Sequence, residues 1–355
     1  MGVNNEKKEP DRRTVSSGNK RSRRGTADSR NRAWCFGARF ASNRVCGSPG
    51  SDQRSGLASC RESMGGSFEP NPKRLRASYG GAAGTSSLHR QKMGRGSQEE
   101  GAKEMKVLVT ANQKGGVGKT STLVHLAFDF CERGLKVAVI DLDLQGNASY
   151  TLQAWRSGVV ASSFFNGVPV QVVTELEENM ALIESDAALA DMEKLTVADA
   201  GERFRAGVAS LAEQGFDVCL IDTAPSLGIS MVAALLSADF VLSPVELEVY
   251  AIQGIRKMVM TIANVRKANP KLQFIGMVPS KVDARNPRHG RHLEELEQAY
   301  PKLIVPVSVG LRSSMADALA SGVPVWQIKK TAARKAAKEI RALADLVYKR
   351  MEITK

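Results

Sequence analysis

The sequence predicts an α/β domain in which a mostly parallel, doubly wound sheet carries helices on both faces. Three observations lead to this prediction. From residue 105 onward, short apolar runs alternate with segments of helical periodicity. The apolar runs are nearly continuous, as expected for strands that are buried on both faces of a parallel sheet. A glycine-rich loop lies between the first strand and the first helix, where proteins of this class bind phosphates.

The expected elements follow one another in a regular order along residues 105–355. Gly134 and Gly215 end two of the helices, and Asn269 with Pro270 ends a third. No stretch approaches ~18 consecutive apolar residues, so no transmembrane helix is expected. Strands are expected at 106–111, 136–141, 180–185, 216–222, 240–245, 272–279 and 303–307. Helices are expected at 120–133, 200–214, 227–238, 250–268, 290–299, 312–321 and 329–351.

Residues 1–104 differ in composition from the rest of the chain. The 355-residue chain has a formal charge of +13, and this segment holds 21 Lys and Arg against 10 Asp and Glu. It also contains 15 of the 31 glycines and shows no sustained hydrophobic period, so we expect a disordered, basic, Gly/Ser-rich extension. The extension is either a linker or an arm that binds nucleic-acid phosphates. Residues 105–355 are expected to form one domain, and Met105 is a candidate internal translation start.

The glycine-rich loop is expected to surround phosphate groups, which predicts a P-loop NTPase. Glycines let backbone N–H groups turn toward phosphate oxygens, and the next helix adds its positive end. Lys119 is expected to reach the β- and γ-phosphates, and the Thr120 hydroxyl to bind Mg²⁺. The strict G-x-x-x-x-G-K-[ST] pattern is not met, because position 113 is Gln, and a second lysine, Lys114, opens the loop. The expected phosphate contacts are Lys114, Gly115, Gly116, Val117, Gly118, Lys119, Thr120 and Ser121.

Carboxylates follow two of the expected strands. Asp141 and Asp143 end the second strand, and Asp222 ends the strand at 216–222. Because the carboxyl ends of parallel strands face the ligand crevice, Asp222 is placed where a carboxylate can hold Mg²⁺. Asp141 and Asp143 have the same parity in a strand, so one can orient the metal shell and the other the attacking water. The expected metal site is therefore Thr120, Asp141 and Asp222.

Residues 105–350 resemble the ParA/MinD family of ATPases, whose phosphate loop is the deviant Walker A form with an additional lysine. The segments that match this family in order and spacing are 114–120, 141–147, 221–228, 244–254 and 282–285. Two positions depart from the family pattern, because Leu144 and Ala224 each replace a proline. Within the family, a basic extension before a compact domain that starts at an internal Met is similar to the partition ATPases of incompatibility-group P plasmids.

The resemblance implies an ATP-bound homodimer that hydrolyses ATP with Mg²⁺. It implies that Lys114 reaches the partner subunit's phosphates, that Asp143 orients the attacking water, and that Lys119 binds the transferred phosphate. It places Lys281 and Asp283 beside the nucleobase. It also implies a role in plasmid partition in the cytoplasm, on the nucleoid, with slow hydrolysis that a ParB-type centromere-binding protein stimulates.

The composition of the C-terminal helix indicates whether the protein binds DNA or a membrane. ParA-type dimers bind DNA non-specifically, whereas MinD-type dimers bind membrane. The apolar stripe of residues 329–351 is mostly alanine, whereas a membrane-surface helix needs bulky apolar residues. We therefore expect the stripe to pack on the domain and the basic residues to face DNA phosphates, with no membrane contact. The expected DNA contacts are Arg285, Arg312, Lys329, Lys330, Arg334, Lys335 and Lys338.

Other interpretations remain open at this point. The basic helix can be a solvated charged face without a ligand, and a MinD-like membrane switch for division-site placement is the functional alternative. A reductase similar to the nitrogenase iron protein shares the phosphate loop but needs cysteines at the dimer interface to hold an iron–sulfur cluster. Cys131 on the first helix and Cys219 inside a buried strand are not suitably placed for that cluster.

Overall fold

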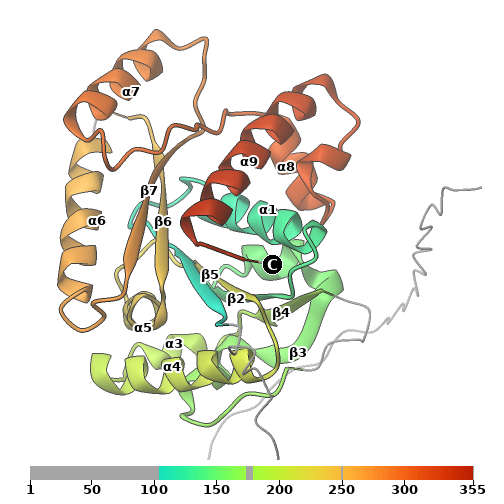
Figure 1. Ribbon diagram of the computed structural model, residues 1–355, viewed down its shortest axis with the longest axis vertical. Helices are drawn as coiled ribbons and strands as arrows, with labels where there is room; N and C mark the ends of the chain where they lie inside the picture. Colours follow the sequence, from blue (N-terminus) through green and yellow to red (C-terminus); the bar gives the residue numbers. More distant parts are fainter. Residues whose placement is uncertain (1–103, 173–178, 249–250, 355) are drawn as a thin grey trace, which may run out of the picture. The chain divides into compact units, whose positions relative to one another are not determined.

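A computed structural model describes residues 104–172, 179–248 and 251–354. The predicted disordered extension lies outside the described residues, except for Glu104. In the described part, seven strands form one parallel sheet in the order β3-β4-β2-β5-β1-β6-β7 (Figure 1). The strands are β1 (Lys106–Thr110), β2 (Val137–Leu142), β3 (Arg156–Val160), β4 (Met180–Glu184), β5 (Val218–Thr223), β6 (Phe240–Glu246) and β7 (Gln273–Ser280). The predicted parallel α/β architecture is confirmed.

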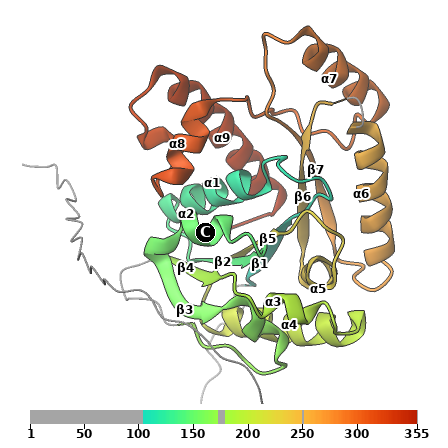
Figure 2. The same cartoon turned by 180° about the vertical axis from the view of Figure 1, so that it is seen from behind.

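Helices cover both faces of this sheet (Figures 1 and 2). The described helices are α1 (Lys119–Glu132), α2 (Asn147–Thr151), α3 (Leu189–Met192), α4 (Val197–Glu213), α5 (Ile229–Ser237), α6 (Ala251–Val265), α7 (Pro287–Ala299), α8 (Ser313–Ala320) and α9 (Thr331–Arg350). Three short 3₁₀ helices are η1 (Gln153–Trp155), η2 (Ala161–Phe165) and η3 (Val325–Gln327). No helix in the described segments has the length and apolarity needed to cross a membrane.

Two hydrophobic cores lie on opposite faces of the sheet. Along β1, Val107 and Val109 pack into a core with α4, α5 and α6, while Leu108 between them packs into a core with α1, α8 and α9. This alternation follows from the strand geometry, in which successive side chains point to opposite faces. Because both faces are covered, every residue of β2 and β5 is buried. The near-continuous apolar runs of the sequence therefore have their expected cause.

One predicted strand is wrong, and several short elements are absent from the prediction. Residues 303–307 form no strand; Ile304 only makes an isolated parallel bridge to Met277. Pro279 of β7 has no N–H to donate to the Val305 carbonyl, so the ladder ends after the Val305 N–H bonds to the Met277 carbonyl. The prediction also lacks β3, whose sequence Arg-Ser-Gly-Val-Val contains no apolar run because it is an edge strand with alternating exposure.

Helix α9 is fastened to α1 by charged and aromatic side chains. The Arg341 guanidinium pairs with Asp129 and Glu132 of α1 and lies over the Trp326 ring at 3.7 Å from its centroid. The apolar stripe of α9 is buried, as predicted, although Ala337 is only partly covered. The buried residues of the stripe are Ala333, Ala336, Ile340, Leu343, Ala344 and Val347. The helix therefore uses its apolar face inside the domain.

Candidate functional site

The glycine-rich loop connects β1 to α1 at the carboxyl edge of the sheet. Gly116 and Gly118 have φ values of 72° and 94°, in the left-handed region that glycine adopts without strain. Gly118 is the residue before the first turn of α1, so the loop enters the helix through this conformation. Asn112 fixes the start of the loop: its amide donates to the Pro244 carbonyl at 2.7 Å, and its Oδ1 accepts from the Lys114 N–H at 2.9 Å.

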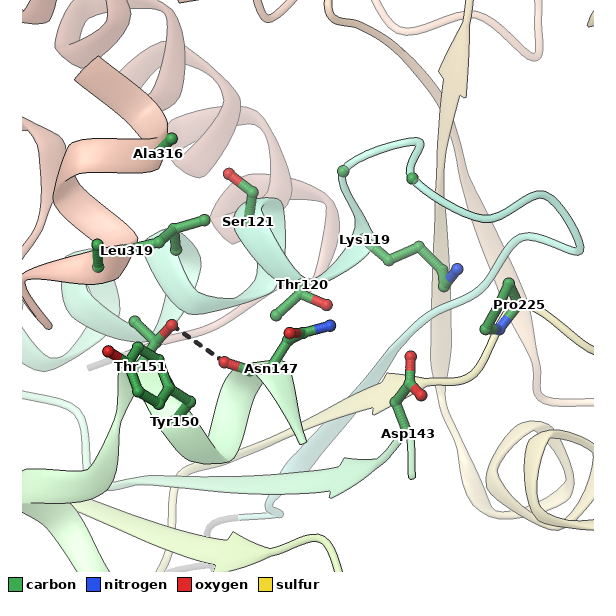
Figure 3. Close-up of a pocket in the computed structure, with 13 residues that line it drawn as sticks. Lys119, Thr120, Ser121, Asp143, Asn147, Tyr150, Thr151, Pro225, Ala316 and Leu319 are labelled. Carbon is green, nitrogen blue, oxygen red and sulfur yellow. Dashed lines mark hydrogen bonds between the residues drawn. The ribbon is translucent and has the colours of Figure 1, made fainter. Parts of the chain in front are cut away.

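Lys119 is largely buried at the start of α1, with 6% of its surface exposed. Its ammonium lies 3.4 Å from the Lys114 carbonyl oxygen, across the loop. Burial lowers the pKa of Lys119, while the negative charges of Asp222 and Asp143 act in the opposite direction. In Figure 3 the side chain extends from α1 toward Pro225 and the carboxylate of Asp143. The ammonium is thus held where the loop would receive an anion.

The hydroxyl of Thr120 and the carboxylate of Asp222 meet beside this lysine. Thr120 Oγ1 donates to Asp222 Oδ2 at 2.6 Å, and Thr110 Oγ1 donates to Asp222 Oδ1 at 3.1 Å. Asp222 is fully buried, and burial, together with the charge of Asp141, raises its pKa to about 7. A buried carboxylate next to a hydroxyl is a set of hard oxygen donors, which fits Mg²⁺.

The two acids at the end of β2 have different surroundings. Asp141 Oδ2 accepts from both the N–H and the hydroxyl of Ser149, each at 2.8 Å, and Oδ1 accepts from the Asp143 N–H at 3.1 Å. Burial raises the pKa of Asp141. Asp141 therefore holds the turn that follows β2, whereas the carboxylate of Asp143 lines the cavity next to the loop. The shared parity of the two residues does not bring both carboxylates to the same cavity.

A cavity of about 450 Å³ lies between the loop, α2 and α8 (Figure 3). Its lining includes Gly116, Gly118, Lys119, Thr120, Ser121, Asp143 and Asn147. A second cavity of about 210 Å³ adjoins it and shares Gly118, Ser121, Ala316 and Leu319 with it. The second cavity is mostly apolar, with Val309, Leu311 and Met315 in its wall. The first cavity carries Lys119, Thr120 and Asp143 on its loop side, and the adjoining cavity is more apolar, which matches a ligand that joins a phosphate chain to a flat ring.

Of the two residues expected beside the nucleobase, Lys281 lines the second cavity and Asp283 does not. Lys281 follows β7 with a φ of 54°, an uncommon conformation for a residue with a side chain. The Asp283 carboxylate accepts from Arg285 Nε at 3.1 Å and from Nη2 at 3.2 Å. That pairing lowers the pKa of Asp283 and directs its charge to Arg285.

Lys114 lines neither cavity. Its Nζ lies 3.2 Å from Glu246 Oε2 and 2.5 Å from Glu248 Oε2, just after β6. Partial burial acts to lower the pKa of Lys114, but the hydrogen bonds to Glu248 and Glu246 outweigh it and hold the pKa above its ordinary value. The ammonium is therefore charged and already neutralised by carboxylates of its own chain.

The residues expected to contact DNA are only partly brought together. Arg312 is largely buried and forms a double pair with Glu339, with Nη2 at 2.7 Å from Oε1. Lys330 Nζ lies 2.6 Å from Asp317 Oδ2 on α8. Arg285 is exposed on a different element, next to Asp283. The exposed basic residues at the start of α9 are Lys329, Lys330, Arg334, Lys335 and Lys338.

Sequence reasoning did not find several residues of the site. Thr110 and Ser149, which donate to the two buried carboxylates, carry no motif signal, because hydroxyls are common in strands and short helices. Glu246 and Glu248 lie in the segment 244–254 that matched a family pattern, yet their contact with Lys114 joins residues 132 and 134 positions apart. Only the folded arrangement of β1 and β6 brings them together.

Comparison with known proteins gives a consistent result. A family model described as an AAA domain matches residues 105–274. Protein IncC of Escherichia coli is 58% identical over 353 residues, which covers 97% of each chain. The chromosome partitioning protein ParA of Myxococcus xanthus is 30% identical over 228 residues, 62% of this chain and 80% of that protein. The structure of cobyrinic acid a,c-diamide synthase from Mycobacterium smegmatis with bound ADP and magnesium has a TM-score of 0.54 and 26% identity, over 69% of this chain and 95% of that one. The predicted fold class is confirmed.

Proposed function

The chain belongs to the ParA/MinD family of P-loop ATPases, and from this membership we propose that it acts in plasmid partition as an ATP-dependent, DNA-binding dimer. It is an ATPase of the partition type and uses ATP with Mg²⁺. One observation carries the proposal. The buried Lys119 and Asp222 and the partly buried Thr120 converge on a phosphate loop that also carries a second lysine, Lys114.

The loop and α1 bind the phosphate chain in this proposal. The backbone N–H groups around Gly116 and Gly118, with the ammonium of Lys119, bind the β- and γ-phosphates. Thr120 and Asp222 would hold the magnesium ion, which neutralises charge on the phosphates when bound. Asp141 supports this arrangement by fixing the turn after β2, and Asp143 orients the attacking water from the wall of the cavity.

The ring of the nucleotide occupies the second, apolar cavity. Val309, Leu311 and Met315 provide contact area for a flat base, and Lys281 borders the base on the side of β7. Asp283 acts indirectly, by holding Arg285 beside the same loop. The shared residues Gly118 and Ser121 join the two cavities, so that the sugar lies over the start of α1.

Two ATP-bound subunits pair so that Lys114 reaches the phosphates of the partner subunit. A cation at that place stabilises charge that develops on the transferred phosphoryl group. The cation is supplied only in the dimer, which makes hydrolysis depend on dimerisation. A ParB-type centromere-binding protein would accelerate this step, which is slow in its absence, and thereby release the dimer from DNA.

The exposed lysines and arginine at the start of α9 are the proposed DNA surface. The apolar face of α9 is buried against α1, so α9 offers a membrane only its charged face. Arg312 supports this surface through Glu339 on α9 instead of contacting DNA directly. Contacts of this kind with phosphates are independent of sequence and weaken steeply with salt. The dimer would thus be located in the cytoplasm, on the nucleoid, and not at the membrane.

Co-sedimentation of the full chain with plasmid DNA and with anionic liposomes tests this proposal. The expected result is DNA binding with a slowly hydrolysed ATP analogue and Mg²⁺, weak binding with ADP, and no liposome binding. A second series with residues 105–355 measures what the basic extension adds to DNA affinity. ATP-dependent binding to liposomes in place of DNA would support the MinD-like membrane switch instead.

A further inference from the structure

Lys114, the lysine proposed to act across the subunit interface, is already paired with carboxylates of its own subunit. Lys114 Nζ lies 3.2 Å from Glu246 Oε2 and 2.5 Å from Glu248 Oε2, so one ammonium contacts two carboxylates. Glu246 is the last residue of β6, and Glu248 follows it after one intervening residue. The Glu248 N–H donates to the Glu246 carbonyl at 2.9 Å. We call Glu246 and Glu248 the acidic pair.

The backbone brings the acidic pair to the phosphate loop. β1 and β6 are neighbours in the sheet, and both end at the same edge. Asn112 ties the start of the loop to the Pro244 carbonyl, two residues before Glu246. The same Asn112 accepts a hydrogen bond from the Lys114 N–H. The main chain of Lys114 is thereby held beside the end of β6, within reach of the acidic pair.

We propose that Glu246 and Glu248 are positioning residues that hold Lys114 on its own subunit until an ATP-bound partner takes its ammonium. The inference rests on the proposed function, because it assumes that Lys114 acts on the phosphates of the partner. In addition, the acidic pair competes with the partner's triphosphate for the ammonium of Lys114. The acidic pair therefore sets how much ATP is needed before two subunits stay together.

The charges in the competition explain why ATP and ADP would differ. An ammonium between two carboxylates is already neutralised, so a new anion must offer stronger attraction to displace them. The γ-phosphate provides that attraction, whereas ADP lacks it. All three side chains are at least partly exposed, so each pair is individually modest and the exchange is reversible. Without the acidic pair, Lys114 would be available to a partner at a lower ATP concentration.

The test is the double variant Glu246→Gln/Glu248→Gln in the full chain. Glutamine keeps the shape of each side chain and removes its charge. Dimer formation is followed by analytical ultracentrifugation during titration with a slowly hydrolysed ATP analogue and Mg²⁺. We expect half-maximal dimerisation at a ~3- to 10-fold lower analogue concentration, the range that two partly exposed ion pairs can supply. In ATP turnover, KM should fall by a similar factor while kcat stays within about twofold.

Two matched variants control for charge and shape. Glu294→Gln/Glu295→Gln changes the net charge of the chain equally at two exposed positions on α7, and it should leave the dimerisation curve unchanged. Glu246→Asp/Glu248→Asp keeps both charges and should return the curve most of the way to that of the original chain. If the charge of the acidic pair alone produces the effect, both control variants should dimerise nearly like the original chain, and only Glu246→Gln/Glu248→Gln should differ.

Unchanged or weaker dimerisation of the glutamine variant would overturn the inference, since the acidic pair would then be neutral or favourable for the dimer. The Lys114→Ala variant distinguishes this result from failure of the proposed function. If Lys114→Ala dimerises and hydrolyses ATP like the original chain, the cross-subunit role itself is wrong. If Lys114→Ala loses turnover while the glutamine variant behaves like the original chain, only the role of the acidic pair is wrong.

Discussion

Thr120 Oγ1 donates a 2.6 Å hydrogen bond to Asp222 Oδ2, which joins the first turn of α1 to the end of β5 across 102 residues of sequence. The contact lies beneath the phosphate loop, next to the ammonium of Lys119, and Asp222 is fully buried. A hydroxyl and a carboxylate at this position are the oxygen ligands that a magnesium–nucleotide complex requires. Several expected results depend on this group of three side chains.

Asp222→Asn should remove most of the magnesium-dependent turnover without unfolding the protein. The amide oxygen still accepts from one threonine hydroxyl and the amide NH₂ donates to the other, but the charge that holds the ion is lost, so kcat should fall by at least ~100-fold. Because burial raises the pKa of Asp222 to about 7, ionisation weakens the nucleotide-free fold as the pH rises through that value. At about pH 8 the Tm of the variant should therefore equal or exceed that of the original chain. A large loss of Tm would show that the effect on turnover is structural.

Lys119→Ala should abolish nucleotide binding. The ammonium is the positive charge placed inside the loop, and charge-assisted hydrogen bonds to phosphate are worth ~1.5–3 kcal/mol each, so ATP affinity should fall by at least ~100-fold. Titration calorimetry with ATP and Mg²⁺ measures this directly. Thermal stability without nucleotide should change little, because burial already disfavours the charged form of Lys119. Retained ATP affinity would mean that the cavity beside the loop is not the phosphate site.

Lys114→Ala and Asp143→Ala should reduce turnover much more than ATP affinity. Lys114 does not line the cavity and is paired with Glu246 and Glu248 in the single subunit, so it should contribute little to the first binding step. Asp143 lines the cavity and would act on the water, not on the phosphate chain. We expect a fall in partner-stimulated kcat of ~100-fold or more with a Kd for ATP within about threefold. An unchanged kcat for Lys114→Ala would contradict its cross-subunit role.

Lys335→Gln/Lys338→Gln should weaken DNA binding uniformly across sequences. Each lost phosphate contact reduces the slope of log K against log salt by ~0.9, so the double variant should lower the slope by ~1.8. Fluorescence anisotropy with duplexes of unrelated sequence, over a range of salt concentrations, measures this slope. The matched control is Lys267→Gln/Lys271→Gln, which makes an equal charge change at two exposed positions. Both positions precede β7, at the end of the strand far from the phosphate loop. Equal effects of the two variants would mean that net charge, and not α9, determines binding.

His125 should make the protein less stable in mild acid. The ring is fully buried; Nδ1 lies 2.7 Å from the Ser121 carbonyl, to which it donates, and Nε2 accepts from the Val325 N–H at 3.2 Å. Burial lowers the pKa of His125 to about 4, so folding favours the neutral ring. The resulting stability is complete above the unfolded pKa of about 6.5 and is lost as the pH falls toward about 4.

Urea unfolding between about pH 7.5 and 4.5 measures this loss. The free energy of unfolding should fall with a slope that approaches ~1.4 kcal/mol per pH unit from this group. His125→Gln should be less stable at neutral pH but should show a shallower fall in acid. A fall that is equally steep in the variant would assign the acid sensitivity to other groups.

The sequence predicts the interior strands well because they are buried on both faces of the sheet and are therefore apolar along their length. The edge strand β3 is not predicted by this pattern, because three of its five residues are exposed and only the other two are partly buried. At 303–307 the apolar run is misleading, because Pro279 of β7 has no N–H for the Val305 carbonyl and the segment bridges β7 only at Ile304. Apolar patterning reports burial, and only the hydrogen-bonding pattern distinguishes a strand from a buried extended segment.

The candidate site, like the sheet, could be predicted only in part. The glycines, Lys119 and Thr120 were predicted because their chemistry is local to one loop. The contacts of Lys114 with the acidic pair and of Asp141 with Ser149 were not, because each depends on which side chains face one another after folding. Arg312 was predicted to contact DNA because it is a basic residue near other basic residues. In the structure it pairs with Glu339, and charge counts along the sequence do not reveal that partner.

Helix α1 begins at the phosphate loop and ends where Asp129 and Glu132 hold Arg341 of α9. Its 14 residues span about 21 Å, so a tilt of about 3° at the loop displaces the far end by about 1 Å. His125 ties the middle of the helix to η3, just before α9. Because these contacts connect α1 to α9, a change in the direction of α1 at the loop would also change the position of the lysine-bearing helix.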